Sequence, residues 1–352
     1  MNKRLLLISI LLLFLVPIIF LKDNPMVSKK DNPRVSKIVS QTDFAEDNLN
    51  TFETENTDVS IETLRKGNYP GSDLVIEQTL SPGSNYDRYI VSYKSEGLKI
   101  YVLLTVPQTE APEGGFPAIV FNHGYIPPDQ YQTTERYASY QDTFARAGFV
   151  TIKSDYRGHG NSEGEATGAY GSNVYTIDVL NAASSLKKYS KVNPSKIGMW
   201  GHSLGGFITL RAMVVSKDIK AGVIWAGVVG SYPDLINNWR RVTGTPFPLP
   251  SGARRWRQVL QERFGTPAEN PAFWNSISAN SYLSDISGPL QLHHGTADLS
   301  VPIRFSQIFD KQMRDAGKTA ELYEYPGDDH NLANNFSLAA QRSVEFFDKY
   351  LK

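Results

Sequence analysis

The chain contains 352 residues, of which 41% are hydrophobic and 20% charged, and its 36 basic side chains balance its 36 acidic ones. A balanced charge gives no long-range field that would attract nucleic acid or a strongly acidic partner. The sequence contains no cysteine, which excludes disulfides, thiolate metal sites, a cysteine nucleophile and a lipid-modified N-terminal cysteine. The length allows about two domains, although an α/β fold of this size can also form one unit.

The N-terminal segment has the composition of a targeting signal. Lys3 and Arg4 precede an apolar run, residues 5–21. Its 17 residues are long for the core of a signal peptide and at the lower limit for a membrane-spanning helix, and no small-x-small cleavage site follows them. We expect residues 1–21 to be a signal peptide or an N-terminal membrane anchor, with an uncleaved anchor favoured. The rest of the chain would then lie on the extracytoplasmic side.

A polar stretch, residues 22–72, separates this segment from the pattern of a folded domain. It is rich in Lys, Asp, Asn, Ser, Thr and Glu and shows no sustained apolar period. This composition is typical of a mobile linker or stalk. Within it, residues 58–66 admit a short helix.

From residue 73 the sequence predicts an α/β domain. Three strand-like runs, 74–80, 88–93 and 98–106, are separated by Ser-Pro-Gly and Ser-Glu-Gly turns, which predicts antiparallel strands. Further strands are expected at 118–121, 149–153, 197–200, 222–225, 290–293 and 321–325, and helices near 131–147, 170–190, 204–216, 302–317 and 334–351. This alternation predicts a mainly parallel, doubly wound sheet that binds ligands at the C-terminal ends of its strands.

One segment, residues 231–285, interrupts the alternation. It holds three tryptophans and several prolines, and no strand is expected within it. An insertion between two strands at the ligand-binding edge of such a sheet is typical of a cap or lid. The tryptophans fit a small core of the cap and a wall of the substrate pocket equally well.

A Gly-x-Ser-x-Gly motif joins a predicted strand to a predicted helix. Gly201-His202-Ser203-Leu204-Gly205 follows strand 197–200 and opens helix 204–216. A serine at such a joint occupies a tight, strained turn that exposes its hydroxyl, and the unpaired N–H groups of the helix N-terminus face a developing oxyanion. The motif therefore indicates a nucleophile, provided that the chain supplies a base and an acid.

All six histidines fall where a predicted strand ends, so polar chemistry collects at one edge of the sheet. They are His123, His159, His202, His293, His294 and His330. The clustering alone does not say which of them transfers a proton.

The order of the motifs resembles that of the α/β-hydrolase family, in which the serine precedes the acid and the acid precedes the histidine. The matching stretches are Gly-His-Ser-Leu-Gly-Gly at 201–206, His-Gly-Thr-Ala-Asp-Leu-Ser-Val-Pro at 294–302, Asp-Asp-His at 328–330, Asn-His-Gly-Tyr at 122–125 and Asp-Tyr-Arg-Gly-His-Gly-Asn-Ser-Glu-Gly at 155–164. The resemblance covers residues 73–352. Within the family, the chain is similar to the catalytic domain of the prolyl oligopeptidase (S9) group and to related esterases.

The resemblance implies an α/β-hydrolase fold and a catalytic triad. Ser203 would be the nucleophile, His330 the general base and then acid, and Asp298 the acid that orients His330. Asp328 and Asp329 adjoin His330 and are rivals for the acid, although a neighbouring carboxylate reaches the far ring nitrogen poorly.

The oxyanion hole requires two N–H donors. Leu204, directly after the nucleophile, would supply one, and Tyr125, in the loop after strand 118–121, would supply the other. The sequence His-Gly-Tyr departs from the His-Gly-Gly-Gly of many lipases, so the Tyr125 ring could line the pocket instead.

The other polar residues at this edge are predicted to be structural. His202 should project away from the base, His294 should pack at its strand end, and His123 and His159 should shape loops. Asp155 and Arg157 are expected to form hydrogen bonds of a turn and a salt bridge, although Asp155 is also a conceivable catalytic acid.

The sequence thus predicts a serine hydrolase that cleaves an ester or a peptide bond of a small molecule or short peptide. The S9 group usually carries a β-propeller, for which residues 22–72 are too short, and this shifts weight toward esters and small amides. An acyltransferase on the same triad and a catalytically retired surface binding protein are the alternatives. No cofactor or metal is expected, because adjacent His293 and His294 suit no ligand geometry and no Gly-x-Gly-x-x-Gly occurs.

Overall fold

Nine strands form one mixed sheet in the part of the chain that the computed structural model describes, residues 59–239 and 255–352. Their order across the sheet is β1-β2-β3-β5-β4-β6-β7-β8-β9. The predicted signal or anchor (1–21) and most of the predicted linker (22–72) lie outside these residues. Within the described ranges, no helix combines the length and the apolar character that a membrane span needs.

The first three strands form an antiparallel meander at one edge of the sheet. β1 (Val75–Leu80) pairs with β2 (Tyr86–Ser95), and β2 pairs over its whole length with β3 (Leu98–Pro107). The turn between β2 and β3 consists of Glu96 and Gly97, both with positive φ (48° and 84°), as a two-residue hairpin requires. The antiparallel arrangement predicted for this region is confirmed.

Six parallel strands make up the rest of the sheet. They are β4 (Phe116–Asn122), β5 (Val150–Ser154), β6 (Val192–His202), β7 (Ile219–Trp225), β8 (Leu290–Gly295) and β9 (Ala320–Tyr325). Every residue of β4, β5 and β8 is buried, and in β4 this burial on both faces explains the continuous apolar run. The chain continues from β4 to β5 on one side and later to β6 on the other. The C-terminal ends of β4 and β6 therefore form the switch point at which open α/β sheets bind ligands.

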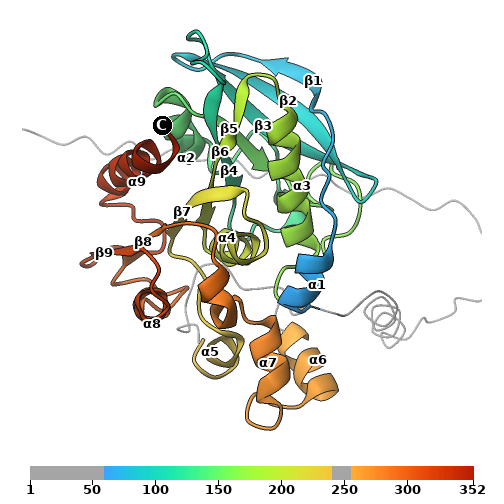
Figure 1. Cartoon of the computed structure of the whole chain (residues 1–352), viewed down its shortest axis with the longest axis vertical. Coiled ribbons are helices and arrows are strands. Elements are labelled where there is room, and N and C mark those ends of the chain that lie inside the picture. The colour runs from blue at the N-terminus through green and yellow to red at the C-terminus, as the bar shows by residue number, and fades with distance from the viewer. Residues whose placement is uncertain (1–58, 240–254) are drawn as a thin grey trace, which may run out of the picture. The chain divides into compact units, whose positions relative to one another are not determined.

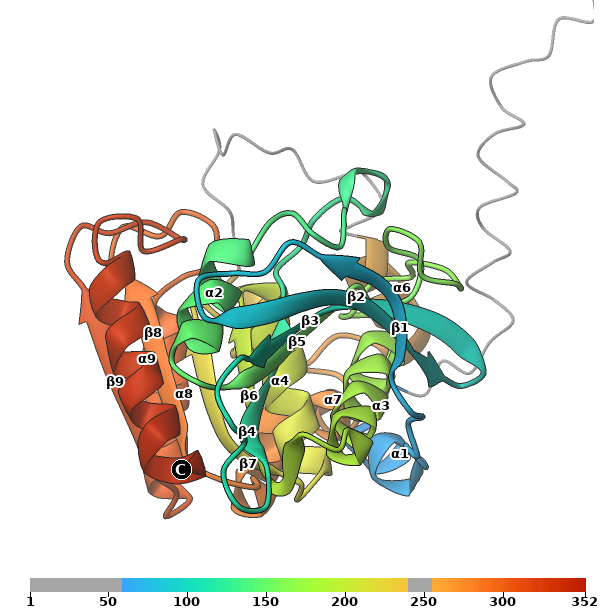
Figure 2. The same cartoon turned by 90° about the horizontal axis from the view of Figure 1, so that it is seen from above.

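Helices cover both faces of the sheet (Figure 1). One face carries α2 (Ala138–Arg146) and α9 (Phe336–Leu351), and the other carries α1 (Ile61–Lys66), α3 (Val174–Lys188), α4 (Leu204–Val215) and α8 (Arg304–Asp315). Figure 2 shows α9 and α3 on opposite sides of the strands. The predicted doubly wound architecture is confirmed.

One helix begins later than its sequence pattern indicates. The pattern predicts a helix near 131–147, whereas α2 begins at Ala138. The 3-10 turn η2 (Pro128–Gln130) comes first, and Arg136 and Tyr137 then adopt left-handed backbone, with φ of 42° and 53°. Because left-handed residues cannot continue a right-handed helix, α2 can start only after Tyr137.

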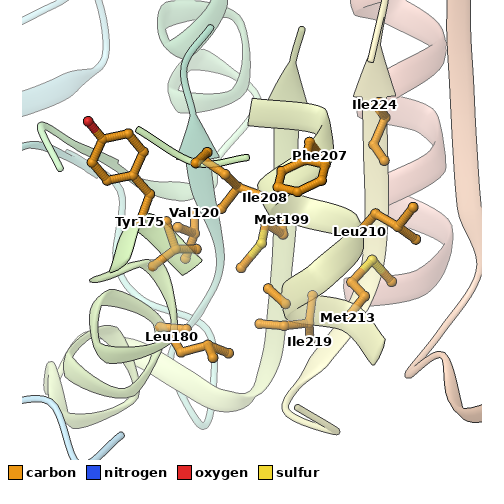
Figure 3. Packing of buried hydrophobic residues seen from close by; sticks show 14 of the residues in the cluster. Val120, Tyr175, Leu180, Met199, Phe207, Ile208, Leu210, Met213, Ile219 and Ile224 are labelled. Atoms are coloured by element: carbon orange, nitrogen blue, oxygen red, sulfur yellow. The ribbon is translucent and has the colours of Figure 1, made fainter. Parts of the chain in front are cut away.

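The helix that follows the Gly-x-Ser-x-Gly motif is buried on all sides. Every residue of α4 except Val215 is buried. In Figure 3 its Phe207, Ile208, Leu210 and Met213 pack among Val120, Met199, Ile219 and Ile224. Burial of each large apolar side chain stabilises the fold by about 1.5–3 kcal/mol. This packing fixes the first turn of α4, directly after Ser203.

The end of the predicted linker, residues 59–72, packs on the domain. Val59, Ile61 and Leu64 belong to the core cluster. The buried Arg211 of α4 donates hydrogen bonds to the carbonyl oxygens of Val59 (2.8 Å) and Ile277 (2.7 Å). The ordered domain therefore includes residues that precede position 73.

The described part of segment 231–285 is helical. It comprises α5 (Tyr232–Asn237), α6 (Arg255–Phe264), α7 (Pro271–Ile277) and the 3-10 segment η4 (Ala279–Asp285), all between β7 and β8 in the chain. The helices α5, α6 and α7 gather at one end of the domain, at the bottom of Figure 1.

Candidate active site

Ser203 occupies a sharp turn between β6 and α4. Its backbone has φ 55° and ψ −117°, a combination that residues with a side chain avoid and that costs on the order of 1–3 kcal/mol. The Ser203 N–H donates to the Trp225 carbonyl (3.0 Å), and the Ser203 carbonyl accepts from the N–H groups of Gly206 (3.0 Å) and Val228 (3.1 Å). These bonds hold the serine in its strained conformation. Strain of this kind gathers at functional sites.

The glycines around the serine allow backbone segments to approach closely. A Cβ at Gly205 would collide with the Asn122 carbonyl at the end of β4, and a Cβ at Gly201 would collide with the Gly205 carbonyl. A Cβ at Gly124 would lie 3.3 Å from the Ser203 Cβ. The loop after β4 and the turn after β6 therefore meet at Ser203, at the switch point of the sheet.

Asp298 and His330 meet at the same edge of the sheet, after β8 and β9 respectively. The His330 Nδ1 lies 2.7 Å from the Asp298 Oδ2. The Asp298 side chain is fully buried, whereas the His330 side chain is 20% exposed. Because an ionised carboxylate only accepts hydrogen bonds, the neutral His330 ring carries its hydrogen on Nδ1. Its Nε2 is then an acceptor.

Four donors converge on the carboxylate of Asp298. Its Oδ1 accepts from the backbone N–H groups of Ser300 (2.7 Å) and Val301 (3.0 Å), and its Oδ2 accepts from His330 and from His294 Nε2 (3.1 Å). Burial opposes ionisation, but the hydrogen bonds from His294 and His330 outweigh it and hold the pKa of Asp298 well below its usual range. Asp298 is therefore ionised at neutral pH.

His294 is a residue that the sequence pattern does not single out as part of the site. Its Nε2 faces two acceptors, the Asp298 carboxylate and the Val301 carbonyl (3.0 Å), so this nitrogen carries a hydrogen. Its Nδ1 lies 2.8 Å from the Ser306 hydroxyl, which donates to it in the neutral ring. His294 is packed at its strand end as predicted, but it also contacts the carboxylate that meets His330. The four-residue spacing of His294 and Asp298 is the signal that was available.

Asp328 and Asp329 are engaged away from the His330 ring. Both carboxylates accept backbone N–H groups of the loop 329–335. Of the carboxylates in the described ranges, Asp298 is the one in hydrogen-bond contact with the His330 ring.

Arg157 forms an ion pair, but its main partner is not Asp155. Its Nη2 lies 2.7 Å from Asp178 Oδ1, and both side chains are largely buried. Asp155 instead accepts hydrogen bonds from the hydroxyls of Tyr131 and Thr133, and burial raises its pKa to about 7. Asp178, on α3, thus has a structural role, whereas the expected ion pair between Asp155 and Arg157 is not formed.

Three further histidines are buried and neutral. His123 stacks between the rings of Tyr131 and Tyr156, at centroid distances of 4.7 and 4.2 Å, and burial lowers its pKa well below the usual value. Burial also lowers the pKa of His202 and of His293 to about 3. Within residues 59–239 and 255–352, no three His, Asp or Glu side chains gather in a way that could hold a metal ion.

The two predicted oxyanion donors belong to the segments that meet at Ser203. Leu204 opens α4, so its N–H has no acceptor within the helix. Tyr125 follows Gly124 in the loop after β4, and this residue is 41% exposed.

An aromatic cluster connects segment 231–285 to the site. Tyr170 contacts Phe207 of α4, Trp239 and Trp256, with ring centroids 5.0, 5.5 and 5.4 Å apart. The Trp239 Nε1–H donates to the Ser300 carbonyl (2.9 Å) in the loop after β8. The cluster thus borders both the helix that follows the serine and the loop that carries Asp298.

Known proteins share this sequence pattern. Residues 136–352 match the model of the prolyl oligopeptidase family. The chain is 25% identical over 246 residues to the uncharacterized peptidase YtmA of Bacillus subtilis, a match that covers 70% of this chain and 86% of that protein. It is 24% identical over 271 residues to a probable dipeptidyl-aminopeptidase B of Coccidioides posadasii, a match that covers 75% of this chain but 27% of that protein.

Solved structures share the fold. The acylaminoacyl peptidase of Pyrococcus horikoshii superposes with a TM-score of 0.61 and 24% identity, over 76% of this chain and 42% of that one. Est1E of Butyrivibrio proteoclasticus, solved with ferulic acid bound, superposes with a TM-score of 0.54 and 22% identity, over 72% of this chain and 98% of that one. The chain thus spans less than half of the larger relatives. Because the family model matches more than half of the chain, we conclude that the chain belongs to the prolyl oligopeptidase family and is a serine hydrolase.

Proposed function

We propose that this serine hydrolase cleaves esters or small amides through an acyl-enzyme on Ser203, with His330 as the base and Asp298 as the acid. The proposal depends on the 2.7 Å contact between His330 Nδ1 and Asp298 Oδ2, at the sheet edge that also carries Ser203. This contact keeps the hydrogen on Nδ1 and leaves Nε2 free to accept the proton of the serine hydroxyl. Asp298 orients the ring and stabilises its protonated form without taking the proton.

The proposed reaction has two halves. The Ser203 Oγ attacks the carbonyl carbon of the substrate, its proton passes to His330 Nε2, and the N–H groups of Leu204 and Tyr125 bind the oxyanion. His330 then gives this proton to the leaving alcohol or amine as its bond to carbon breaks. Water then attacks the acyl-enzyme as His330 takes its proton, and the bond from the acyl carbon to Ser203 Oγ breaks. His330 returns this proton to Oγ, which releases the acid and regenerates the serine.

An apolar acyl group is the substrate feature that the surroundings of the site favour. The aromatic cluster of Tyr170, Phe207, Trp239 and Trp256 lies beside the first turn of α4 and the loop after β8. Est1E, which this chain covers almost completely, was solved with ferulic acid, an aromatic acid. We therefore propose small esters or amides with an aromatic or apolar acyl group as substrates.

A fluorophosphonate probe tests the nucleophile, and matched substrates test the bond. The wild-type chain should be labelled at Ser203, and Ser203→Ala should lose both labelling and turnover. Turnover of 4-nitrophenyl esters should exceed that of 4-nitroanilides with the same acyl group. A wild-type protein that resists labelling would overturn the mechanism, and preference for the anilides would identify a peptidase.

We also propose that residues 1–21 export the chain or anchor it in a membrane. The support is the charged pair Lys3 and Arg4 ahead of the apolar run 5–21. Cell fractionation should find the full chain in the membrane or outside the cell, and a chain that begins at residue 22 in the cytosol. Equal cytosolic recovery of both would contradict the proposal.

A further inference from the structure

A chain of hydrogen bonds connects the loop after β4 to the loop that carries His330, through two side chains that the proposed mechanism does not use. The Gly124 N–H donates to the Tyr137 hydroxyl (3.0 Å), and this hydroxyl lies 2.7 Å from His202 Nδ1. On the other side of the ring, His202 Nε2 lies 2.9 Å from the His330 carbonyl oxygen. The chain therefore joins four segments that are distant in sequence.

Each of these three hydrogen bonds has one donor-to-acceptor direction that satisfies all of the groups involved. The His330 carbonyl can only accept, so His202 Nε2 carries a hydrogen. Burial lowers the pKa of His202 to about 3, so the ring is neutral and Nδ1 has a free lone pair. The Tyr137 hydroxyl donates to this lone pair and accepts from Gly124. The direction of all three bonds is thereby determined.

The backbone at Tyr137 is strained, and a buried cation stabilises this strained conformation. Arg136 and Tyr137 have consecutive left-handed conformations, with φ of 42° and 53°, which residues with side chains avoid. The ammonium group of Lys153, on a fully buried side chain, donates to the carbonyl oxygens of Glu135 (2.7 Å) and Arg136 (3.0 Å). Such strain persists only where the surroundings over-determine the conformation. These backbone contacts fix the start of α2 in a position from which the Tyr137 hydroxyl reaches His202.

We propose that Tyr137 and His202 are positioning residues that align the oxyanion loop and His330 around the nucleophile. Tyr137 fixes the peptide group of Gly124, directly before the proposed donor Tyr125. His202 fixes the backbone of His330. Because His202 directly precedes Ser203, both the oxyanion loop and His330 are aligned relative to the backbone of the nucleophile. Both act through hydrogen bonds rather than proton transfer, and the His202 ring lies against the ring of His330, with centroids 4.7 Å apart, so the expectation that His202 projects away from the base is wrong. This inference rests on the roles proposed above for His330 and Tyr125.

Tyr137→Phe removes the hydroxyl and leaves the Gly124 N–H and His202 Nδ1 without their partner, while the ring remains. We expect kcat for a 4-nitrophenyl ester and the rate of fluorophosphonate labelling to fall by at least about tenfold. KM should stay within about twofold, because ground-state binding is untouched. Tyr140→Phe is the matched control. Its hydroxyl lies 3.5 Å from the Asn331 carbonyl, outside the chain, and kcat should change less than about twofold.

Two substitutions of His202 test the two halves of the hydrogen-bond chain separately. Gln can replace the Nε2 donor toward His330, and Asn can replace the Nδ1 acceptor toward Tyr137. Each should restore one contact and leave kcat below that of the wild type. If the hydrogen-bond chain acts as a unit, the double variant Tyr137→Phe with His202→Gln should have a kcat no lower than that of the slower single variant. The reason is that His202→Gln alone already breaks the link to Tyr137.

The outcomes distinguish this inference from the proposed function. A wild-type protein that is not labelled at Ser203 rejects the proposed function. If the wild type is labelled and Tyr137→Phe behaves like Tyr140→Phe, only the positioning role is rejected. Additive losses in the double variant, or a rise in KM without a fall in kcat, also overturn it. Should Tyr137→Phe fail to fold, the His202→Gln and His202→Asn variants carry the test, with melting temperature as the check on folding.

Discussion

Replacement of Asp298 by asparagine gives the sharpest test of the proposed acid, because the structure predicts a conflict for either orientation of the new amide. The Oδ1 of Asp298 accepts two backbone N–H groups, and the Oδ2 accepts two imidazole N–H groups. An asparagine has one oxygen and one NH2 group. Whichever way it turns, its NH2 group faces two donors.

The catalytic cost follows from the tautomer of His330. If the NH2 group of the new side chain takes the place of Oδ2, it donates to His330 Nδ1, and the hydrogen of the ring moves to Nε2. That nitrogen can then no longer accept the serine proton. The same change in a Ser-His-Asp triad lowers kcat by about 10⁴, or about 5.4 kcal/mol at 1.36 kcal/mol per factor of ten. The opposite orientation leaves the Ser300 and Val301 N–H groups unpaired and costs about 1–3 kcal/mol of stability. We expect kcat/KM to fall by about 10³–10⁴ in Asp298→Asn.

The assay is steady-state hydrolysis of a 4-nitrophenyl ester, with melting temperature as the check on folding. Asp329→Asn is the matched control. It makes the same chemical change directly before His330, on an exposed residue, and should alter kcat/KM by no more than about threefold. A folded Asp298→Asn variant that loses less than tenfold, or equal losses in the two variants, would refute the reasoning.

Three further predictions concern stability and can be measured by urea unfolding. Gly205→Ala should prevent folding, because its new Cβ would collide with the Asn122 carbonyl. At Gly317 no atom of the described residues opposes a Cβ and only the φ of 67° is unfavourable, so Gly317→Ala should lower the free energy of unfolding by about 1–2 kcal/mol. Equal losses in the two variants would contradict this prediction. Asp178→Ala leaves the largely buried Arg157 without its main partner and should cost about 3–5 kcal/mol, so a loss below about 1 kcal/mol would show that water replaces the pair. His293 has a folded pKa of about 3 and an unfolded pKa of about 6.5, so stability is lost as the pH falls below 6.5. At pH 5 this loss is about 2 kcal/mol, and His293→Gln should remove it, which an unchanged pH dependence would disprove.

Much of the fold could be predicted because its causes are local in sequence. The parallel strand β4 is buried on both faces, so its apolar run is continuous and easily recognised. The start of α2 could not be predicted, because the left-handed Arg136 and Tyr137 depend on the ammonium group of Lys153 on β5. No local pattern encodes that contact.

In the candidate site, too, some residues could be predicted from the sequence and others could not. Ser203, Asp298 and His330 could be proposed from motifs and their order, since each lies in the loop or turn that follows a strand. The partner of Arg157 lies on α3, at Asp178, and only the packing of that helix against the sheet brings the two together. The contact of His294 with Asp298 likewise arises from the turn after β8. Residues that act through a neighbour therefore cannot be found from motifs alone.

The helices α5, α6 and α7 enter the chain between β7 and β8, whereas the proposed reacting groups follow β6, β8 and β9. The part that would choose the substrate is therefore inserted between two strands of the core that would perform the chemistry, and it shares that core, since Trp256 and Trp274 are buried in it and the Ile277 carbonyl accepts a hydrogen bond from Arg211 of α4. A transplanted segment should therefore exchange acyl preference only if it also supplies the carbonyl that Arg211 binds and the aromatic rings that pack on Tyr170.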